Sequence, residues 1–373
     1  MSAITIRPVR TKRDEKVFIK FQWKPYEGNP YWVPPLLMDR RKLIDRKKNP
    51  FYQHARMELF LAERDGRVVG RIGAIVNDNH NREQNENVGF FGFFEVLEDQ
   101  AVAFALFDAA AQWLRGQGVT AMRGPASPSV NDEYGMLVEG FDRTPAILMS
   151  YNPPYYARFA EAYGFVKAKD LYTWYLQGVK VFSERFVRVS EAAKQRQDLV
   201  FRPINMKDFD NELERVHEIY SRGWQRNWGE VPLTDAEFDY MARDLKPVVN
   251  PALVIFAESK GKPVGFGLAL PDYNLILRGN RHGWLLPALL RMIFLKKRID
   301  YARIVILGVL PEYIKSGIGA LLFYETGRAV TNSGMPHGEA SWVLEDNVMM
   351  NRGAQMMNGE ITKKHRIYEY PLT

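Results

Sequence analysis

The chain repeats itself, and this internal repeat constrains its fold more than any other feature of the sequence. When the sequence is shifted by 195 positions, separated residues of the first half fall on identical residues of the second half. The matches include Arg7 on Arg202, Gly70 on Gly265 and Asn152 on Asn347, all in one register. A register kept across separated regions is typical of a duplicated structural unit. We therefore predict two copies of one fold.

The register of the repeat slips once and then recovers. Leu106 and Gly118 match Leu322 and Gly334 with an offset of 216 instead of 195. The second copy therefore carries 21 extra residues (216 − 195) before Leu322, and the first copy carries the same number after Gly118. Insertions in a duplicated scaffold usually lie on loops, and loops carry function. Both insertions are candidate functional segments.

The sequence pattern of each copy predicts an α+β fold, in which a mixed, mostly antiparallel sheet is flanked by helices. At 373 residues the chain is too long for one ordinary core. We expect domains at 1–180 and 198–373, joined by a charged linker helix at 181–197. The expected elements of each copy share one order and are a first strand (4–9; 199–204), a hairpin turn (65–66; 260–261), a third strand (88–96; 302–309), a long helix (101–115; 317–330) and a final aromatic strand (172–176; 366–371).

Composition excludes several classes of site. The chain has no cysteine, which rules out disulfides, thiolate zinc sites and a cysteine nucleophile. Its six histidines lack metal-ligand spacing, so we expect no metal. The N-terminus has no apolar signal segment, and no apolar run reaches the roughly 18 residues of a membrane span. We expect a cytoplasmic protein, with peripheral contact to the inner membrane left open. The net charge of +7 favours an anionic partner.

A glycine turn in the second copy predicts an anion cradle. The apolar strand that ends at Val309 is followed by a polar turn with Gly317 and Gly319 and then by an apolar-faced helix. The first N–H groups of a helix have no intrahelical partner, and the helix dipole favours negative charge there. The first copy is three residues shorter at this place and reads Leu-Glu-Asp-Gln at 97–100, with acids where phosphate would lie. We therefore place the anionic ligand on the second copy.

The order of elements and this loop resemble the GNAT acyltransferase superfamily, and the two copies resemble its tandem members. The family's loop reads Gln/Arg-x-x-Gly-x-Gly/Ala, so both glycines match, whereas Ile314 replaces the basic residue and Lys315 is displaced by one. The resemblance implies that the second copy binds acyl-CoA in a gap where the strand before the loop splays from the next strand. It also implies that the backbone of Val309 or Leu310 donates to the thioester carbonyl. The implied cofactor-binding residues are Val309, Leu310, Ile314, Lys315, Ser316, Gly317, Ile318, Gly319, Ala320 and Asn347. The family's frequent general-acid tyrosine would fall on Ala354, so that role is either vacant here or filled by another residue.

Four longer segments resemble a narrower bacterial group that includes ceramide synthase-like N-acyltransferases. They are GFFGFFE (Gly89–Glu95), GPASPSVNDEYGMLVEGFD (Gly124–Asp142), YNPPYY (Tyr151–Tyr156) and WVLEDN (Trp342–Asn347). This resemblance implies an acceptor that is a long-chain, sphingoid amine and a ceramide-like amide as the product.

Acyl transfer to an amine needs a base, because an alkylamine with a pKa near 10.4 is almost wholly protonated at neutral pH. The candidate catalytic residues are Glu95, at the end of a phenylalanine-rich strand, and Asp132, Glu133 and Tyr134 in the first insertion. Burial of Glu95 would raise the pKa of its carboxyl and suit it to this role. The alternatives are that Glu95 reaches solvent and that the other three residues cap a helix.

We therefore expect an acyl-CoA-dependent N-acyltransferase that acts on a primary amine. The alternatives are a small-molecule N-acetyltransferase and a tRNA-dependent aminoacyl transferase of the tandem-GNAT type. A nucleic-acid-binding regulator is suggested only by the basic pI, and no recognition helix supports it, so we expect no nucleic-acid partner. The apolar run at 284–295, followed by Lys296, Lys297 and Arg298, is interpreted either as a core helix or as a helix that docks on a membrane or lines an acyl tunnel.

Overall fold

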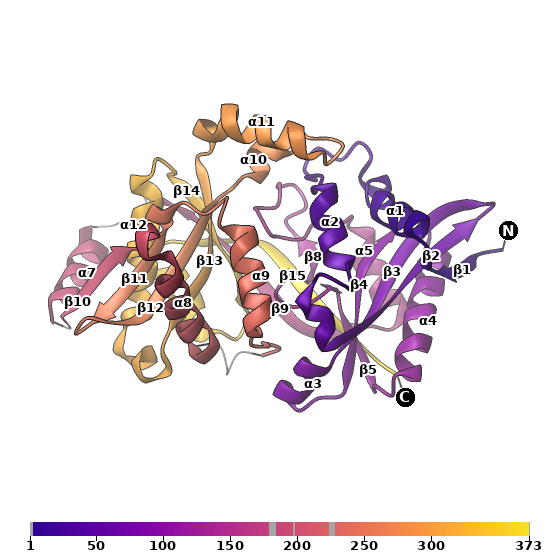
Figure 1. Ribbon diagram of the computed structural model, residues 1–373, viewed down its shortest axis with the longest axis horizontal. Coiled ribbons are helices and arrows are strands. Elements are labelled where there is room, and N and C mark those ends of the chain that lie inside the picture. The colour runs from indigo at the N-terminus through magenta and orange to yellow at the C-terminus, as the bar shows by residue number, and fades with distance from the viewer. Residues whose placement is uncertain (1–2, 179–183, 197, 224–227, 373) are drawn as a thin grey trace. The chain divides into compact units, whose positions relative to one another are not determined.

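The computed structural model describes residues 3–178, 184–196, 198–223 and 228–372 (Figure 1). The chain divides into two compact units, and neither is continuous in sequence. Unit 1 comprises Met1–Leu171, Leu277–Arg291 and Lys363–Thr373, and unit 2 comprises Tyr172–Ile276 and Met292–Thr362. The division of the sequence at 1–180, 181–197 and 198–373 describes the two copies and stays a prediction.

Unit 1 is a sheet with helices on both faces. Its strands run in the spatial order β1-β2-β3-β4-β5-β15, and β8 also pairs with β15. The large apolar core lies between the sheet and α4 and includes Ile72, Phe91 and Phe107. The elements are β1 (Thr5–Pro8), α1 (Lys12–Phe21), η1 (Lys24–Tyr26), α2 (Leu37–Ile44), η2 (Pro50–Gln53), β2 (Ala55–Arg64), β3 (Arg67–Asn77), α3 (Asp78–Gln84), β4 (Val88–Val96), α4 (Gln100–Gly116), β5 (Ala121–Gly124), β6 (Ala126–Ser127), β7 (Glu133–Tyr134), β8 (Met136–Glu139), α5 (Tyr155–Tyr163), the start of β9 (Val166–Gln177) and the end of β15 (Glu360–Pro371).

Unit 2 has a sheet of the spatial order β9-β14-β13-β12-β11-β10. Helix α12 packs on it through buried residues such as Ile318 and Leu322. A helix, α7, forms within the predicted linker. The elements are α7 (Glu184–Arg196), β10 (Leu199–Pro203), η3 (Met206–Asp208), α8 (Phe209–Gly223), α9 (Asp235–Leu245), η4 (Pro251–Leu253), β11 (Val254–Ser259), β12 (Lys262–Pro271), most of α10 (Asn274–Leu277), η5 (Lys296–Arg298), β13 (Tyr301–Val309), η6 (Pro311–Ser316), α12 (Ile318–Asn332), β14 (His337–Leu344) and α13 (Val348–Met356). Helix α11 (Leu285–Leu295) begins in unit 1 and ends in unit 2, with the division after Arg291.

The duplication predicted from the sequence is confirmed by local details that recur in both units. The hairpin turns both have two residues at positive φ, Asp65 and Gly66 in unit 1 and Lys260 and Gly261 in unit 2. This is the turn that matches the twist of a two-residue hairpin. The first strand of each unit is also held alike, because Arg7 Nε donates to Glu63 and Arg202 Nε donates to Glu258, each at 2.8 Å.

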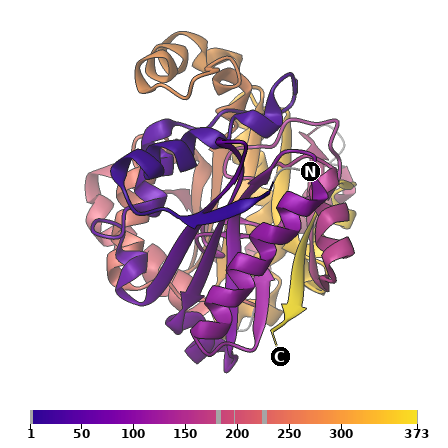
Figure 2. The same ribbon diagram turned by 90° about the vertical axis from the view of Figure 1, so that its right-hand side faces the viewer.

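The final strands form where they were expected, but each belongs to the other unit's sheet. Strand β15 pairs antiparallel with β5 in unit 1, from Tyr368 opposite Gly124 to Pro371 opposite Ala121. Figure 2 shows this yellow C-terminal strand beside the strands of unit 1, with α4 crossing in front of them. The end of β9, from Tyr172 onward, lies in unit 2 next to β14. Alternating residues predict a strand, but they do not specify its partner.

Candidate functional site

The glycine turn of unit 2 forms an open helix N-terminus. Gly317 has a φ of 84°, in the left-handed region that favours glycine, and it is the N-cap of α12 without a capping side chain. The N–H groups of Ala320 and Leu321 both donate to the Gly317 carbonyl, at 3.1 and 3.2 Å. The N–H of Gly319 has no intrahelical acceptor because it lies in the first turn. A Cβ at Gly319 would meet only Val309 Cγ2, at 3.9 Å, so the space beside this backbone is open.

The strand that leads to this turn separates from its parallel neighbour. Strand β13 pairs with β14 only from Tyr301 to Ile304, although β13 continues to Val309 and β14 to Leu344. On its other side, the Leu310 N–H donates to the Val264 carbonyl at 2.9 Å. The Leu310 N–H is therefore already hydrogen-bonded within the sheet, and its expected role as oxyanion donor stays a prediction. Because hydrogen-bonded pairs alternate along an antiparallel ladder, the N–H of Val309 points away from β12, toward the side that β14 has left.

The remaining residues of the predicted cradle take three kinds of position. Ile318 is buried, whereas Ala320 is exposed at the start of α12. Ile314, Lys315 and Ser316 lie in η6, where Lys315 is exposed and has no ion-pair partner in the described part of the chain. Ser316 Oγ donates to the Tyr313 carbonyl at 2.6 Å and accepts from the Ile318 N–H at 3.3 Å. Asn347 uses its side-chain oxygen as the N-cap of α13, where it accepts from the Met350 N–H at 3.1 Å.

At the corresponding helix of unit 1, the N-terminus is filled by the unit's own carboxylate. Asp99 caps α4 by accepting from the N–H groups of Ala101 and Val102, at 3.1 and 3.2 Å. The same carboxylate forms an ion pair with Arg64. The acidic sequence at this place therefore occupies the site where an anion would bind.

The gap between the parallel strands of unit 1 is also filled. Strands β4 and β5 pair only from Val88 to Phe90, and β6 then lies against β4. A Cβ at Gly92 would fall 1.7 Å from the Ala126 carbonyl oxygen, and Ser127 Oγ accepts from the Phe93 N–H at 2.8 Å. Only glycine permits this approach. The equivalent space in unit 1 is thus taken by its own backbone.

The strand-end amide of unit 1 has a side-chain partner as well. Val96 is the equivalent of Val309, because Val96 lies opposite Gly70 and Val309 lies opposite Gly265. The Val96 N–H donates to Tyr156 Oη at 2.9 Å. In unit 2 the position of Tyr156 is taken by Asn351, which donates instead to the carbonyls of Leu344 and Glu345. This amide is therefore satisfied by a tyrosine in unit 1, whereas the equivalent position in unit 2 is held by an asparagine that bonds other carbonyls.

Glu95 lies buried in a cluster of charged and phenolic groups in unit 1. Its side chain accepts from Tyr156 Oη at 2.8 Å and lies 3.6 Å from Arg71 Nη2. Burial raises the pKa of this carboxyl to about 7, against the opposing effects of Arg71 and of the hydrogen bonds. Of the two alternatives left open by the sequence, the structure shows the buried one, and the catalytic role of Glu95 stays a prediction.

The other three candidate catalytic residues do not cap a helix. Glu133 and Tyr134 form the short strand β7, and Asp132 accepts from Ser129 Oγ at 2.6 Å in the preceding turn. Glu133 forms an ion pair with Arg40, a residue of α2. The negative charges of Glu133 and Glu95 both act on the Arg40 guanidinium, and of the two only Glu133 forms a direct ion pair with it among the described contacts.

The two arginines of this cluster were not singled out by the sequence. Arg71 is 2% exposed, and its Nη1 donates to the Phe18 carbonyl at 2.7 Å. Within the described ranges, Arg71 Nε and both Nε and Nη1 of Arg40 are buried without a hydrogen-bond partner. Buried donors of this kind are costly unless an oxygen acceptor satisfies them. No local motif marks these residues, because they come from α2 and from the middle of β3.

In unit 2 the sequence also missed Glu230, a buried carboxylate. Glu230 is buried, and burial raises the pKa of its carboxyl to about 7, while Tyr220 Oη donates to it at 3.2 Å. Three residues after Tyr220, a Cβ on Gly223 would lie 3.2 Å from the Val309 carbonyl oxygen, so the end of α8 borders the end of β13. Arg222 pairs with Glu312 at 3.0 Å beside the glycine turn. These contacts join segments about 90 positions apart, which no motif could show.

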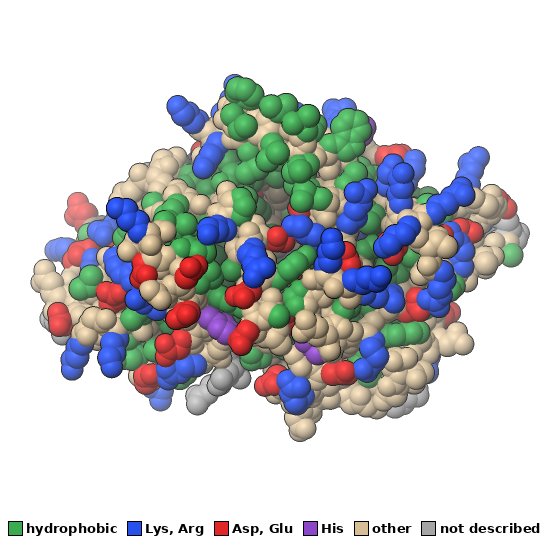
Figure 3. All heavy atoms as spheres, viewed as in Figure 1, with side chains coloured by type: hydrophobic (Ala, Val, Ile, Leu, Met, Phe, Trp, Pro, Cys, Tyr) green, Lys and Arg blue, Asp and Glu red, His purple; other side chains and the backbone are tan. Residues whose placement is uncertain are grey.

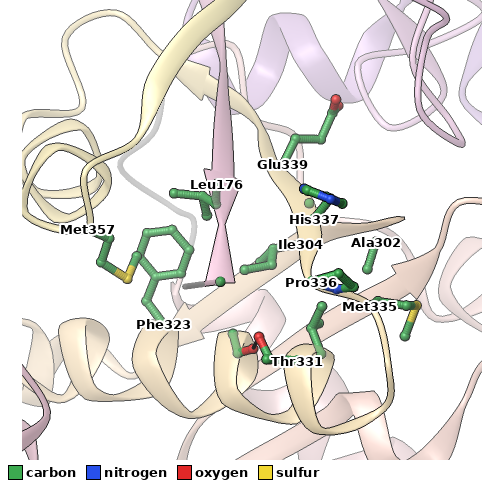
Figure 4. A pocket seen from close by; sticks show the side chains of 14 residues that line it. Leu176, Ala302, Ile304, Phe323, Thr331, Met335, Pro336, His337, Glu339 and Met357 are labelled. Atoms are coloured by element: carbon green, nitrogen blue, oxygen red, sulfur yellow. Dashed lines mark hydrogen bonds between the residues drawn. The ribbon is translucent and has the colours of Figure 1, made fainter. Parts of the chain in front are cut away.

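A separate apolar pocket lies at the other end of the parallel pair in unit 2. It is bounded by α12, by the paired starts of β13 and β14, and by the end of β9, with Phe323, Ile304 and Leu176 among its walls (Figure 4). Neither Val309 nor the glycine turn contributes to it. Within the described residues, no group of three or more His, Asp or Glu side chains is placed to hold a metal ion.

Comparisons with known proteins give relatives over the full length of the chain. It is 33% identical over 372 residues to protein YghO of Escherichia coli K12, covering 98% of this chain and 94% of the relative. It is 34% identical over 383 residues to the bacterial ceramide synthase of Caulobacter vibrioides, covering 99% and 98%. No protein-family model matches the sequence.

Solved structures show the same fold at low sequence identity. A tandem GNAT protein from the clavulanic acid biosynthesis pathway matches with a TM-score of 0.57 at 15% identity, over 100% of this chain and 99% of that one. A GCN5-related N-acetyltransferase from Sphaerobacter thermophilus matches with a TM-score of 0.53 at 12% identity, over 99% and 96%. The tandem GNAT architecture therefore extends along the whole chain.

Proposed function

We propose an N-acyltransferase function for this chain because it belongs to the family of tandem GNAT-fold proteins that contains bacterial ceramide synthase and YghO. In this proposal the acyl donor is acyl-CoA, the acceptor is a primary amine, and unit 2 binds the donor. Unit 1 keeps the fold and has the role of binding the acceptor or of supporting the sheet.

The observation that carries the proposal is the contrast between the two copies. Three places are filled in unit 1 by its own groups: the helix N-terminus by Asp99, the gap beside β4 by Ser127, and the strand-end amide by Tyr156. The corresponding helix N-terminus of unit 2 carries Gly317 and Gly319; Gly317 offers no capping side chain, and Ser316 Oγ accepts from the Ile318 N–H at 3.3 Å. A helix N-terminus beside an open backbone favours a phosphate group, as a CoA pyrophosphate would provide.

The residues of unit 2 suit the chemistry of acyl transfer. An ammonium acceptor first loses a proton to a carboxylate, and the neutral nitrogen then attacks the thioester carbonyl. The Val309 N–H is oriented to donate to the oxygen as it gains negative charge. The C–S bond then breaks, CoA leaves as a thiolate, and the second nitrogen proton is lost to give the neutral amide.

Glu230 is our candidate for the base on unit 2, and Glu95 is the candidate on unit 1. Both carboxyls have pKa values raised by burial to about 7, so near neutral pH each is poised to accept a proton. Single Glu95→Gln and Glu230→Gln variants distinguish them. The base is the residue whose replacement by glutamine abolishes the increase of kcat/KM with pH. That replacement should leave the affinity for CoA unchanged.

For the acceptor we propose a long-chain amine with an oxygen close to the nitrogen. The relative from Caulobacter is named a ceramide synthase, and a ceramide is the amide of such an amine. The buried Nε and Nη1 groups of Arg40 are donors that a hydroxyl or carbonyl oxygen would satisfy. The acceptor therefore needs both a nitrogen nucleophile and an oxygen acceptor.

The decisive experiment measures thiol release and amide formation with acetyl-CoA and long-chain acyl-CoAs, each with a sphingoid base or a short soluble amine. We expect thiol release to require the sphingoid base and a long acyl chain. If acetyl-CoA were the only CoA ester to support thiol release, the lipid N-acyltransferase proposal would be replaced by a small-molecule acetyltransferase. Failure of the protein to bind any CoA ester, together with transfer from an aminoacyl-tRNA, would replace it with the tRNA-dependent alternative.

A further inference from the structure

Helix α11 exposes an unusually apolar surface. Six large apolar side chains of the helix, and Trp284 directly before it, are 45–75% exposed. The six are Leu285, Leu286, Leu289, Leu290, Ile293 and Phe294. Within the helix only Ala288 is buried. The interpretation of this segment as a core helix is therefore wrong. Figure 3 shows the apolar side chains gathered over α11, and contiguous apolar surface of this kind marks an interaction site.

The charged residues in the sequence segment that contains this helix have one sign. Between Asp272 and Asp300 the sequence has no acidic residue, but it has six basic ones: Arg278, Arg281, Arg291, Lys296, Lys297 and Arg298. The net charge of the whole chain is +7, so this short segment holds nearly all of the excess. Lys296, Lys297 and Arg298 follow the apolar helix directly and are exposed.

The start of the helix is fixed rather than loosely attached. In unit 1, Trp23 Nε1 donates to the Arg281 carbonyl at 2.9 Å, and the Leu37 N–H donates to the Gly283 carbonyl at 2.9 Å. Asn280 Nδ2 also donates to the Trp284 carbonyl at 2.8 Å. The fold therefore attaches the start of α11 by hydrogen bonds while large apolar side chains of the helix stay exposed.

We propose that α11 and its basic flank bind the surface of an anionic lipid bilayer. The apolar face would enter the boundary between headgroups and acyl chains, with Trp284 at one end, and the lysines and arginines would contact the anionic headgroups. A helix of 11 residues is too short to span a bilayer. Within the described residues, none of the helices has the length and apolarity of a membrane span, so α11 lies on the surface. This binding does not depend on acyl transfer.

A matched pair of double variants tests the proposal without using any substrate. Ile293→Ser with Phe294→Ser removes two side chains that are 71% and 75% exposed on α11. Val166→Ser with Val200→Ser removes two that are 62% and 57% exposed on other elements. Neither pair changes the charge. The full-length protein is sedimented with vesicles of phosphatidylcholine mixed with phosphatidylglycerol, and with vesicles of phosphatidylcholine alone.

We expect wild type and the Val variant to bind the mixed vesicles, and the α11 variant to bind at least about tenfold more weakly. Lys296→Gln, Lys297→Gln, Arg298→Gln should remove the preference for phosphatidylglycerol, and added salt should weaken wild-type binding. In vesicles of brominated lipid, the tryptophan emission of wild type should be quenched more than that of Trp284→Phe.

Equal vesicle binding by the α11 variant and wild type, or no binding by wild type, would overturn the proposal. A concentration-dependent dimer that the α11 variant abolishes, without vesicle binding, would assign this face to a second copy of the chain.

Discussion

Gly319→Ala separates the role of the glycine turn in binding from its role in folding. Gly319 lies in the first turn of α12 and its φ is not in the left-handed region, and an added Cβ would have no neighbour closer than 3.9 Å. Alanine is favoured over glycine in a helix by about 1 kcal/mol. We therefore expect the free energy of unfolding to stay constant or to rise by up to about 1 kcal/mol.

The same methyl group should weaken the binding of CoA. It stands beside the N–H that a phosphate would approach, and a hydrogen bond to a charged group contributes about 1.5–3 kcal/mol. Since about 1.4 kcal/mol corresponds to a tenfold change in Kd, the loss of one such bond predicts a roughly 10- to 150-fold rise in Kd.

The assay is calorimetric titration with CoA, paired with denaturant unfolding. Gly116→Ala is the matched control, because Gly116 also lies in a helix and its added Cβ would meet nothing within 4 Å. The control should bind CoA like wild type. If Gly319→Ala folds as expected and binds CoA with unchanged affinity, the turn is not the phosphate site and the reasoning from the open helix N-terminus is refuted.

Three other predictions follow from the buried and capping groups. The Glu95 carboxyl holds its proton up to about pH 7 in the folded state but loses it near 4.5 when unfolded, so this group should lower the free energy of unfolding by roughly 3 kcal/mol as pH rises between these values; Glu230 adds a fall of the same sign, so Glu95→Gln should make the fall smaller in urea unfolding measured across pH without abolishing it. Asp99→Ala should lower stability by about 1 kcal/mol through the lost cap of α4 and leave CoA affinity unchanged in the same titration. Arg40→Met should raise KM for the amine and not for acyl-CoA in steady-state kinetics, and equal changes in both would contradict its assignment to the acceptor.

The features of the site that could be predicted are those formed by residues that are adjacent in the sequence. The glycine turn was found because a strand, two glycines and a helix N-terminus are adjacent in sequence. For Glu95 the sequence left burial and exposure at a strand end as alternatives, because the apolar pattern of one strand does not say what covers its end, and the structure shows it buried. Arg40, Arg71 and Glu230 were missed because their importance lies in neighbours far away in the chain.

The sequence by itself determined the duplication, the elements of each copy and the loss of the glycine turn from the first, since these depend on residue order and local backbone preference. Only the tertiary structure decided which sheet each final strand joins, because strand pairing depends on neighbours that periodicity does not specify. It also decided that Asp99, Ser127 and Tyr156 fill three places in unit 1. Finally, it placed α11 at the surface, because an apolar helix has the same sequence pattern whether a core covers it or not.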